Sequence, residues 1–180
     1  MSFIGIRVNF ETSRLIHEID VPGIKTDRTA LHITLLCLGD ETPIEELAQA
    51  MIATYEVSKN TCPFWVKLSC VNYFDITEEG KQYPIIAPVL SPKLHELQGA
   101  LKKSFNKAKI EYNKKFKEYK PHITLSYNDE SIKKTKIEPI EWSVQELTLW
   151  GGAHGDDRIY INFPLELKAN ENISEICCGK

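Results

Sequence analysis

The tetrapeptide His-Ile-Thr-Leu occurs twice in this chain, and the repetition restricts the fold more than any other feature. The copies lie in "ALHITLLC", residues 30–37, and "KPHITLSY", residues 120–127. Both are apolar runs of the length and composition of a β-strand. Because successive side chains in a strand point to opposite faces, the histidine and the threonine of each copy share one face. We therefore expect two related strands, each anchored by its aliphatic face and presenting an imidazole beside a hydroxyl.

The segments around the two copies indicate an α+β protein. Residues 3–10, "FIGIRVNF", alternate as a first strand with Ile4, Ile6, Val8 and Phe10 on its apolar face. Helices are expected weakly over residues 12–19 and strongly over 41–57 and from 91 to 108. Further strands are expected over residues 64–74, 82–90, 142–150 and 158–167, the last two joined as a hairpin by the glycine-rich "GGAHGDD". The predicted fold is α+β and bilobed, a pseudo-twofold duplication with antiparallel sheets, flanking helices and a central cleft.

The two long helices carry detailed start signals. For residues 41–57, Thr42 is predicted to cap the helix, with Pro43 at the first helical position and Glu45 completing a capping box. Ser91 and Pro92 repeat the cap-then-proline pattern for the second helix. The predicted buried stripes are Ile44, Leu47, Ala48, Met51, Ile52 and Tyr55 in the first helix, and Leu94, Leu97, Leu101, Phe105 and Ala108 in the second.

Length and composition set wider limits. A chain of 180 residues with 42% hydrophobic content predicts one compact domain over residues 1–168, followed by a polar tail over 169–180. A net charge of −3 does not favour a general nucleic-acid-coating protein. Without a signal-like or membrane-spanning apolar run, we expect a soluble cytoplasmic protein with no membrane partner and no long nucleic acid partner. The oligomeric state is left open. The odd number of cysteines, without C-x-x-C spacing, predicts free thiols: Cys37, Cys62, Cys70, Cys177 and Cys178.

Charge is unevenly distributed along the chain. Nine lysines stand against three glutamates between Lys93 and Lys120, directly before the second copy of the tetrapeptide. One interpretation is a solvated lysine-rich helix face, and the other is a positive field that attracts a phosphorylated ligand.

The duplicated residues suit phosphoryl transfer by paired acid/base catalysis. If the halves pack about a pseudo-twofold axis, His32 and His122 can face one cleft. One neutral imidazole would remove a proton from the attacking oxygen, while the other, protonated, would donate a proton to the leaving oxygen. Each role is worth roughly 10²–10⁴ in rate. Thr34 and Thr124 could donate hydrogen bonds to the non-bridging phosphate oxygens.

Simpler interpretations also exist for these histidines. A single His-x-Thr in a strand is usually structural, but two identical copies on separate predicted strands favour function. His17 and His95 lie in polar helical contexts, and His154 lies in the glycine-rich loop, so none of the three is expected to act. Spacing of His-x-Thr type without an acidic cluster argues against a metal site. Histidine triad hydrolases need histidine at alternating positions, where this chain has threonine.

With its two His-x-Thr motifs, the chain resembles the two-histidine (2H) phosphoesterase superfamily over most of its length, from residue 3 to about residue 164. The resemblance implies that His32 and His122 are the acid/base pair, that Thr34 and Thr124 hold the phosphate, and that neither metal nor another cofactor is needed. The superfamily includes RNA 2',3'-cyclic phosphodiesterases of 2'-5' RNA ligase type, enzymes that cleave 2'-5' oligoadenylates, RNA-end trimming enzymes, and phage proteins that destroy cyclic-nucleotide defence signals.

The substrate is less determined than the chemistry. Many bacterial RNA cyclic phosphodiesterases of this superfamily carry arginine five residues after the second histidine, where this chain has Tyr127. We therefore favour a cyclic nucleotide or short cyclic oligonucleotide, for instance as a target of phage counter-defence, over RNA ends with 2',3'-cyclic phosphates or 2'-5' linkages. A non-catalytic module that sequesters nucleotides is the third hypothesis. Candidate substrate-binding residues are Arg7, Tyr119, Lys120, Ser126, Tyr127, Trp150 and Tyr160.

Overall fold

The computed structural model describes residues 1–40, 42–75, 81–115, 118–151 and 159–166. Three α-helices, one short 3-10 helix and nine strands follow one another along these residues. In chain order they are β1 (Ser2–Arg7), α1 (Phe10–Glu18), β2 (Ile24–Lys25), η1 (Arg28–Ala30), β3 (His32–Gly39), α2 (Ile44–Ser58), β4 (Phe64–Tyr73), β5 (Tyr83–Pro88), α3 (Pro92–Ala108), β6 (His122–Asn128), β7 (Thr135–Val144), β8 (Glu146–Gly151) and β9 (Ile159–Pro164).

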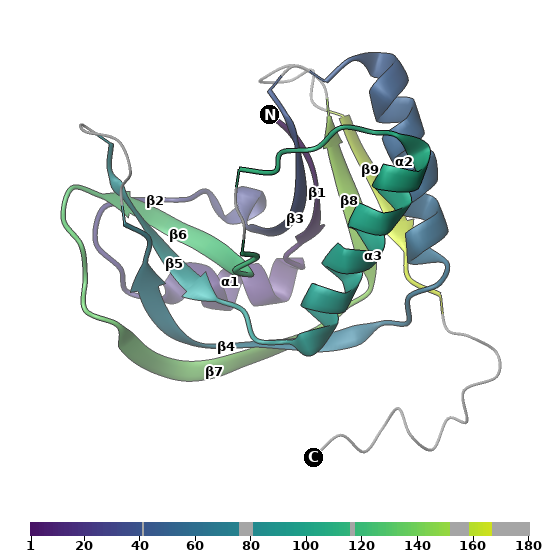
Figure 1. Ribbon diagram of the computed structural model, residues 1–180. Coiled ribbons are helices and arrows are strands. Elements are labelled where there is room, and N and C mark those ends of the chain that lie inside the picture. Colours follow the sequence, from purple (N-terminus) through teal and green to yellow (C-terminus); the bar gives the residue numbers. More distant parts are fainter. Residues whose placement is uncertain (41, 76–80, 116–117, 152–158, 167–180) are drawn as a thin grey trace, which may run out of the picture.

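The strands form two antiparallel sheets, which confirms the predicted α+β architecture (Figure 1). The first sheet has the order β3-β1-β8-β9, and the second has the order β2-β6-β5-β4-β7. Each sheet contains one His-Ile-Thr-Leu strand, with β3 at the edge of the first sheet and β6 between β2 and β5 in the second. Every pairing between strands is antiparallel.

The two sheets exchange strands between the halves of the chain. Strand β4 follows the first histidine strand in sequence, yet it pairs with β5 and β7 in the second sheet. Strands β8 and β9, from the end of the chain, complete the first sheet beside β1. The duplication is therefore a duplication of sheets, and neither sheet corresponds to one continuous half of the sequence.

The helices cover the sheets unequally. Helices α2 and α3 pack against each other and against the first sheet, α2 on β8 and β9 and α3 on β3, whereas α1 packs on β7 of the second sheet (Figure 1). One hydrophobic core cluster extends from Ile4 to Leu165 and takes residues from both sheets and all three helices. The predicted single domain over residues 1–168 stays a prediction, and the predicted tail over 169–180 lies outside the described residues.

The predicted buried stripe of α2 is wrong in part, since Leu47 is buried and Met51 is half-buried but the other four predicted residues are exposed. Ile44 and Ile52 are 63% and 66% exposed, while the buried face contains Leu47, Ala50 and Ala53. The helix turns its small residues inward because it packs closely on α3, where the Ser104 hydroxyl donates to the Ala53 carbonyl over 3.2 Å. In α3 the predicted stripe is confirmed except at its last residue, with Leu94, Leu97, Leu101 and Phe105 buried and Ala108 exposed.

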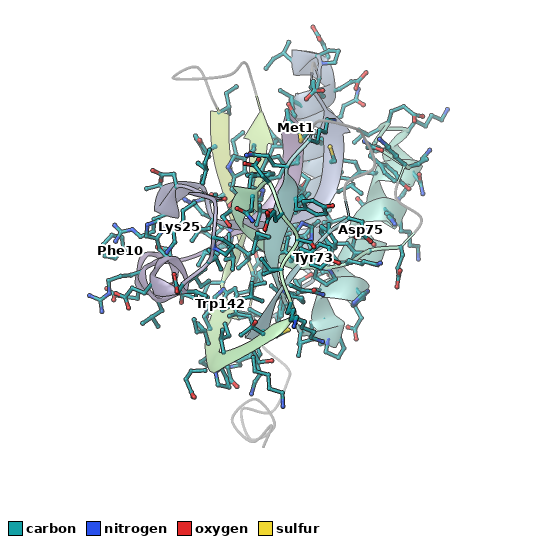
Figure 2. All side chains as sticks on the ribbon, turned by 90° about the vertical axis from the view of Figure 1, so that its left-hand side faces the viewer. Met1, Phe10, Lys25, Tyr73, Asp75 and Trp142 are labelled. Carbon is teal, nitrogen blue, oxygen red and sulfur yellow. The ribbon has the colours of Figure 1, made fainter. Side chains whose placement is uncertain are left out.

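Three other local predictions are corrected by the structure. Helix α2 begins at Ile44 with Pro43 as its N-cap and no side-chain cap bond, so the capping box of Thr42 and Glu45 does not form. The strand predicted over residues 142–150 is two strands, because the chain leaves the second sheet at Val144 and enters the first at Glu146. Phe10 does not extend the apolar face of β1; it begins α1, is 64% exposed and projects at the margin of the molecule (Figure 2).

The remaining segment-level predictions agree with the structure. Both copies of the tetrapeptide, and the segments predicted as strands around residues 64–74 and 82–90, are strands, and β8 pairs antiparallel with β9. The predicted glycine-rich loop between these two strands lies, from residue 152 on, outside the described residues. No helix in the described part of the chain is both long enough and apolar enough to span a bilayer.

Candidate active site

The two His-x-Thr strands meet where the sheets adjoin. Strands β3 and β6 contact each other, although they belong to different sheets and lie far apart in sequence. In both strands the residue between histidine and threonine is completely buried, since Ile33 and Ile123 are each 0% exposed. All four histidine and threonine side chains keep intermediate exposure. The alternation predicted from the sequence is therefore present in both copies, with the aliphatic face in the core and the polar face partly open.

Both imidazoles are held by the same kind of hydrogen bond. His32 Nδ1 lies 2.7 Å from the Ala30 carbonyl oxygen, and His122 Nδ1 lies 2.7 Å from the Lys120 carbonyl oxygen. A carbonyl oxygen can only accept, so Nδ1 carries a hydrogen in both rings. Proton exchange with a ligand is thereby left to Nε2 of each histidine. The two copies of the tetrapeptide therefore hold their histidines in the same tautomer and with the same ring nitrogen bound to the backbone.

The two threonine hydroxyls have no partner in the described part of the chain. Neither Thr34 nor Thr124 forms a side-chain hydrogen bond there, whereas Thr29, Thr61 and Thr148 all do. A partly exposed hydroxyl without a protein partner can donate to a ligand oxygen without first breaking a bond. Each threonine is therefore suited to hold an anionic oxygen next to its histidine.

An aromatic cluster supports His32. The Phe3 ring lies 4.7 Å from the His32 ring and stacks on Trp150 at 4.5 Å with an interplanar angle of 12°. A Cβ added to Gly5 would lie 3.3 Å from Phe3, 3.2 Å from Trp150 and 2.6 Å from the Ile33 carbonyl oxygen. Gly5 is opposite Thr34 in the β1–β3 ladder. Because it has no side chain, the Phe3 and Trp150 rings can pack over it, next to His32.

His122 has a different environment. The Phe74 ring meets it edge-on, with the centroids 4.7 Å apart and an interplanar angle of 85°. Burial lowers the pKa of His122 below its ordinary value, and the hydrogen bond to the Lys120 carbonyl offsets only part of this effect. Desolvation disfavours the charged imidazolium, so the neutral form of His122 is favoured at neutral pH.

Arg7 and Tyr160 lie close to each other beside this site. Arg7 is opposite His32 in the β1–β3 ladder, so its side chain leaves the sheet on the same face as the imidazole. Its guanidinium carbon lies 5.8 Å from the centroid of the Tyr160 ring, which is 50% exposed. Trp150, predicted as a stacking surface for a base, is only 7% exposed and meets Tyr160 edge-on. Of these two aromatic candidates, Tyr160 has the surface available to a ligand.

The structure does not favour a substrate contact by Ser126. Its side chain is completely buried, and its hydroxyl donates to the Pro22 carbonyl over 2.7 Å, because β2 and the preceding loop cover this end of β6. Its neighbour Tyr127 is 45% exposed and pairs with Ile24 and Pro84, so the structure leaves it accessible.

Tyr119 and Lys120 also differ from expectation. The Tyr119 ring meets His95 of α3 edge-on at 5.3 Å, and its hydroxyl is buried, which raises its pKa. It is thus directed toward α3. The Lys120 ammonium is exposed and lies 3.5 Å from Glu118, while the Lys120 carbonyl orients His122. Lys120 therefore contributes to the site through its backbone.

The structure gives no catalytic contact to the other described histidines, and it pairs the acidic residues of the lysine-rich segment. His17 is exposed on α1, and His154 lies outside the described residues. Each of the three glutamates in the segment from 93 to 120 pairs with an exposed lysine of the same segment, one pair on α3 and two pairs after its end. Among the described residues there is no group of three or more His, Cys, Asp or Glu side chains that could hold a metal ion.

Sequence reasoning did not identify Phe3, Gly5 or Phe74. A glycine in the middle of an alternating strand is a signal for close approach of another group, so Gly5 could have been singled out. Phe3 and Phe74 have no such signal, because an aromatic residue in a strand is usually part of the core.

The fold and the site together define a class of protein: two antiparallel sheets, each of which contributes one His-x-Thr strand, with the two strands in contact. The family model of the 2'-5' RNA ligase superfamily matches residues 15–156. The chain therefore belongs to this superfamily, the 2H phosphoesterases. No curated protein sequence matches the chain.

Solved structures confirm the fold at low sequence identity. The structure of TT0787 of Thermus thermophilus is similar with a TM-score of 0.70 and 21% identity, over 91% of this chain and 97% of that chain. Escherichia coli LigT complexed with NADP+ has a TM-score of 0.62 and 20% identity, over 92% and 94% of the two chains. The MHV ns2 PDE domain has a TM-score of 0.53 and 12% identity, over 94% and 91%.

Proposed function

We propose that this protein is a metal-independent phosphodiesterase that cleaves a nucleotide phosphodiester next to a ribose hydroxyl by paired-histidine acid/base catalysis. The observation that carries the proposal is the matched setting of His32 and His122. Each imidazole donates from Nδ1 to the carbonyl two residues earlier, and each is followed two residues later by a threonine whose hydroxyl has no partner in the described chain. A structural histidine would not require this arrangement twice.

In the proposed reaction His122 acts as the base. Its lowered pKa keeps it neutral near pH 7, so its Nε2 accepts the proton from the attacking hydroxyl or water. The new phosphorus–oxygen bond forms as the bond to the leaving oxygen breaks. His32, protonated on Nε2, gives its proton to that oxygen. Thr34 and Thr124 donate hydrogen bonds to the non-bridging oxygens, where negative charge increases in the transition state.

The substrate in this proposal is a cyclic nucleotide or short cyclic oligonucleotide. LigT has been crystallised with 3'-AMP, with ATP and with NADP+, which supports a small nucleotide as ligand in this fold. Arg7 and the exposed Tyr160 ring are the residues that we assign to a phosphate and a base. We also propose that the protein acts in the cytoplasm, for example as a phage protein that destroys a defence signal.

RNA ends with 2',3'-cyclic phosphates, or 2'-5' linkages, are the second candidate substrate. The name of the matching superfamily favours it, because that name refers to 2'-5' RNA linkages. Tyr127 in place of arginine argues in the other direction, since a phosphate-directed charge is missing at this position.

A substrate panel tests the proposal. The protein is incubated with 2',3'-cyclic mononucleotides, cyclic di- and trinucleotides and 2'-5' oligoadenylate in the presence of a chelator, and products are separated by chromatography. We expect turnover of at least one cyclic substrate, with His32→Ala and His122→Ala each slowing it roughly 10²- to 10⁴-fold. His17→Ala, which changes an exposed histidine on α1, is the matched control.

Three outcomes would contradict the proposal in different ways. Ligand binding without turnover would favour the sequestering module. Activity that survives both alanine substitutions would exclude the paired histidines, and activity only after a metal ion is added would exclude the metal-independent mechanism.

A further inference from the structure

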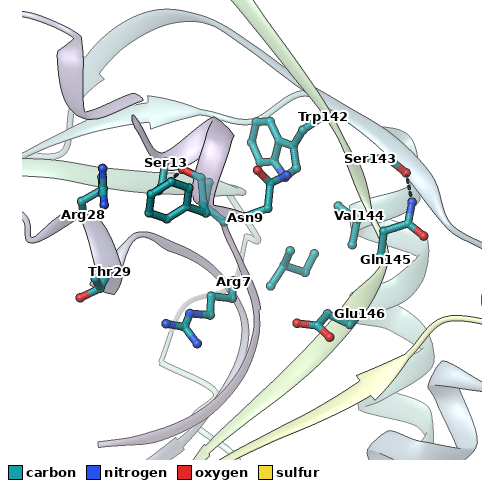
Figure 3. A pocket seen from close by; sticks show the side chains of 13 residues that line it. Arg7, Asn9, Ser13, Arg28, Thr29, Trp142, Ser143, Val144, Gln145 and Glu146 are labelled. Atoms are coloured by element: carbon teal, nitrogen blue, oxygen red, sulfur yellow. Dashed lines mark hydrogen bonds between the residues drawn. The ribbon is translucent and has the colours of Figure 1, made fainter. Parts of the chain in front are cut away.

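A cavity of about 370 Å³ lies between β1, α1, η1 and the junction of β7 with β8 (Figure 3). Neither His32 nor His122 lines it. Arg7, Arg28 and Trp142 reach it from three different elements, β1, η1 and β7. The cavity is thus a separate space that the paired-histidine chemistry does not use.

The cavity wall carries hydrogen-bond donors without acceptors. Neither Arg7 nor Arg28 forms an ion pair in the described part of the chain; their guanidinium groups lie only over the rings of Tyr160 and Phe10. Trp142 is 4% exposed, and its buried indole N–H has no hydrogen-bond partner among the described residues. An unpaired buried donor costs free energy of folding, so a ligand acceptor at this point would be favourable.

Helix α1 adds to the positive character of this wall. Asn9 caps the helix by accepting from the Thr12 amide over 2.9 Å, and both Asn9 and Phe10 line the cavity. The amino end of a helix carries a partial positive charge. Glu146 is the one acidic residue among those that line the cavity. With two arginines and an indole donor, the wall therefore suits a phosphate group, and Glu146 suits a sugar hydroxyl beside it.

The cavity is linked to the proposed catalytic residues through the chain itself. Arg7 lines the cavity and is also paired with His32 in the β1–β3 ladder. Arg28 lies in η1, two residues before Ala30, whose carbonyl orients His32. A ligand that contacts both arginines therefore lies next to the first half-site.

We propose that this cavity is a second phosphate subsite, which binds a further phosphate of the same nucleotide whose phosphodiester lies at His32 and His122. This inference rests on the proposed function and narrows it. The preferred substrate carries at least two phosphates, as an oligonucleotide or cyclic oligonucleotide does, and a cyclic mononucleotide fills only part of the site.

Two substrates with the same reacting group test the subsite. They are 2',3'-cyclic AMP and a 5'-phosphorylated diadenylate that ends in a 2',3'-cyclic phosphate. We expect kcat/KM to be higher for the longer substrate, and Arg28→Ala to lower the ratio of the two kcat/KM values about tenfold, because a hydrogen bond to a charged group is worth about that factor or more. Trp142→Phe, which removes the N–H and keeps a ring, should lower the ratio by a smaller factor.

Arg14→Ala is the matched control, since it removes one exposed positive charge from α1 outside the cavity. An unchanged ratio in Arg28→Ala, or an equal fall in Arg14→Ala, would overturn the subsite. Arg28→Gln is used if Arg28→Ala does not fold, as judged by circular dichroism.

Binding measurements separate this inference from the proposed function. Calorimetric titration of 5'-phosphorylated diadenylate into the His122→Ala variant reports the subsite even if no substrate is turned over. A dissociation constant raised about tenfold by Arg28→Ala supports the subsite, and an unchanged one refutes it. Loss of the paired-histidine mechanism would instead appear as hydrolysis that is insensitive to both histidine substitutions.

Discussion

The two His-x-Thr strands share a sequence, a tautomer and a threonine, but they differ in what surrounds the imidazole. His32 lies on an edge strand beside the stacked Phe3 and Trp150 rings. His122 lies on a strand inside its sheet, next to the edge of Phe74, where burial lowers its pKa. The two copies have therefore kept the same imidazole orientation and the same threonine, while the side chains around each imidazole differ.

This difference supports a division of labour. Acid/base catalysis needs one imidazole neutral and the other protonated at the same pH, and identical environments would give both the same pKa. The desolvated His122 is suited to be the neutral partner. Arg7 and Tyr160 belong to the sheet of His32, and Arg7 also lines the cavity described above, so we propose that the first sheet makes most of the contacts that recognise the substrate.

Among the variants that test this comparison, the largest expected effect concerns the threonine hydroxyls that the two halves share. Thr34→Val and Thr124→Val each remove a hydroxyl and keep the side-chain shape. If both hydroxyls stabilise the transition state, each substitution lowers kcat about a hundredfold, the effect typical of a lost oxyanion donor. Steady-state kinetics on the best substrate of the panel measures this loss. Thr135→Val, on an exposed threonine of β7, is the control.

A hundredfold loss of kcat in one threonine variant with no change in the other would show that the two half-sites are not equivalent. The phosphate would then be held by one half only, and the pseudo-symmetric hydroxyls would have different roles. A rise in KM with kcat unchanged would assign the hydroxyls to substrate binding.

A second prediction concerns a feature that only the first half has. In Gly5→Ala the new Cβ lies 2.6 Å from the Ile33 carbonyl oxygen, which cannot move without disturbing β3. We expect a loss of about 1–3 kcal/mol in the free energy of unfolding, typical of overpacking, together with reduced activity because Phe3 and Trp150 no longer support His32. Urea unfolding measures the stability of this variant.

Gly99→Ala in the middle of α3 is the matched control, because nothing lies within 4 Å of a Cβ added there. It should stabilise the protein by about 0.5–1 kcal/mol, the usual gain from alanine in a helix. Equal effects of the two substitutions would mean that the space above Gly5 is not needed to support His32.

Much of the fold could be predicted because strand alternation and helical periodicity are local properties. The two His-Ile-Thr-Leu strands and the long helices follow from such patterns. The exchange of β4 and β8 between sheets could not be predicted, since the pairing partner of a strand depends on distant residues. The two alanines on the buried face of α2 were missed for a related reason. Ala50 and Ala53 are inside because α3 approaches closely there, and only the packed structure reveals that approach.

The candidate site divides in the same way. Alternation places His32 and Thr34 together, and both keep intermediate exposure. It also placed Ser126 on the face of His122, yet the strand pairing shifts register between Ile85 and Ile86 and the Ser126 hydroxyl is used by Pro22. A bulge of this kind changes which residues share a face, and it leaves no pattern in the sequence of β6 itself.

The smallest expected effect comes from the lowered pKa of His122. The unfolded chain has a histidine pKa of about 6.5, and the folded pKa lies below it. As pH falls through 6.5 the unfolded state therefore binds the proton first, and the folded state loses stability by at most about 1.4 kcal/mol per pH unit from this group. His122→Gln should remove that part of the pH dependence, as measured by urea unfolding at pH 7.5 and pH 5.5. The exposed His17→Gln should keep it. If both variants lose stability toward low pH as the unmodified protein does, His122 is not desolvated in the folded state, and the assignment of the base to the second half-site loses its physical reason.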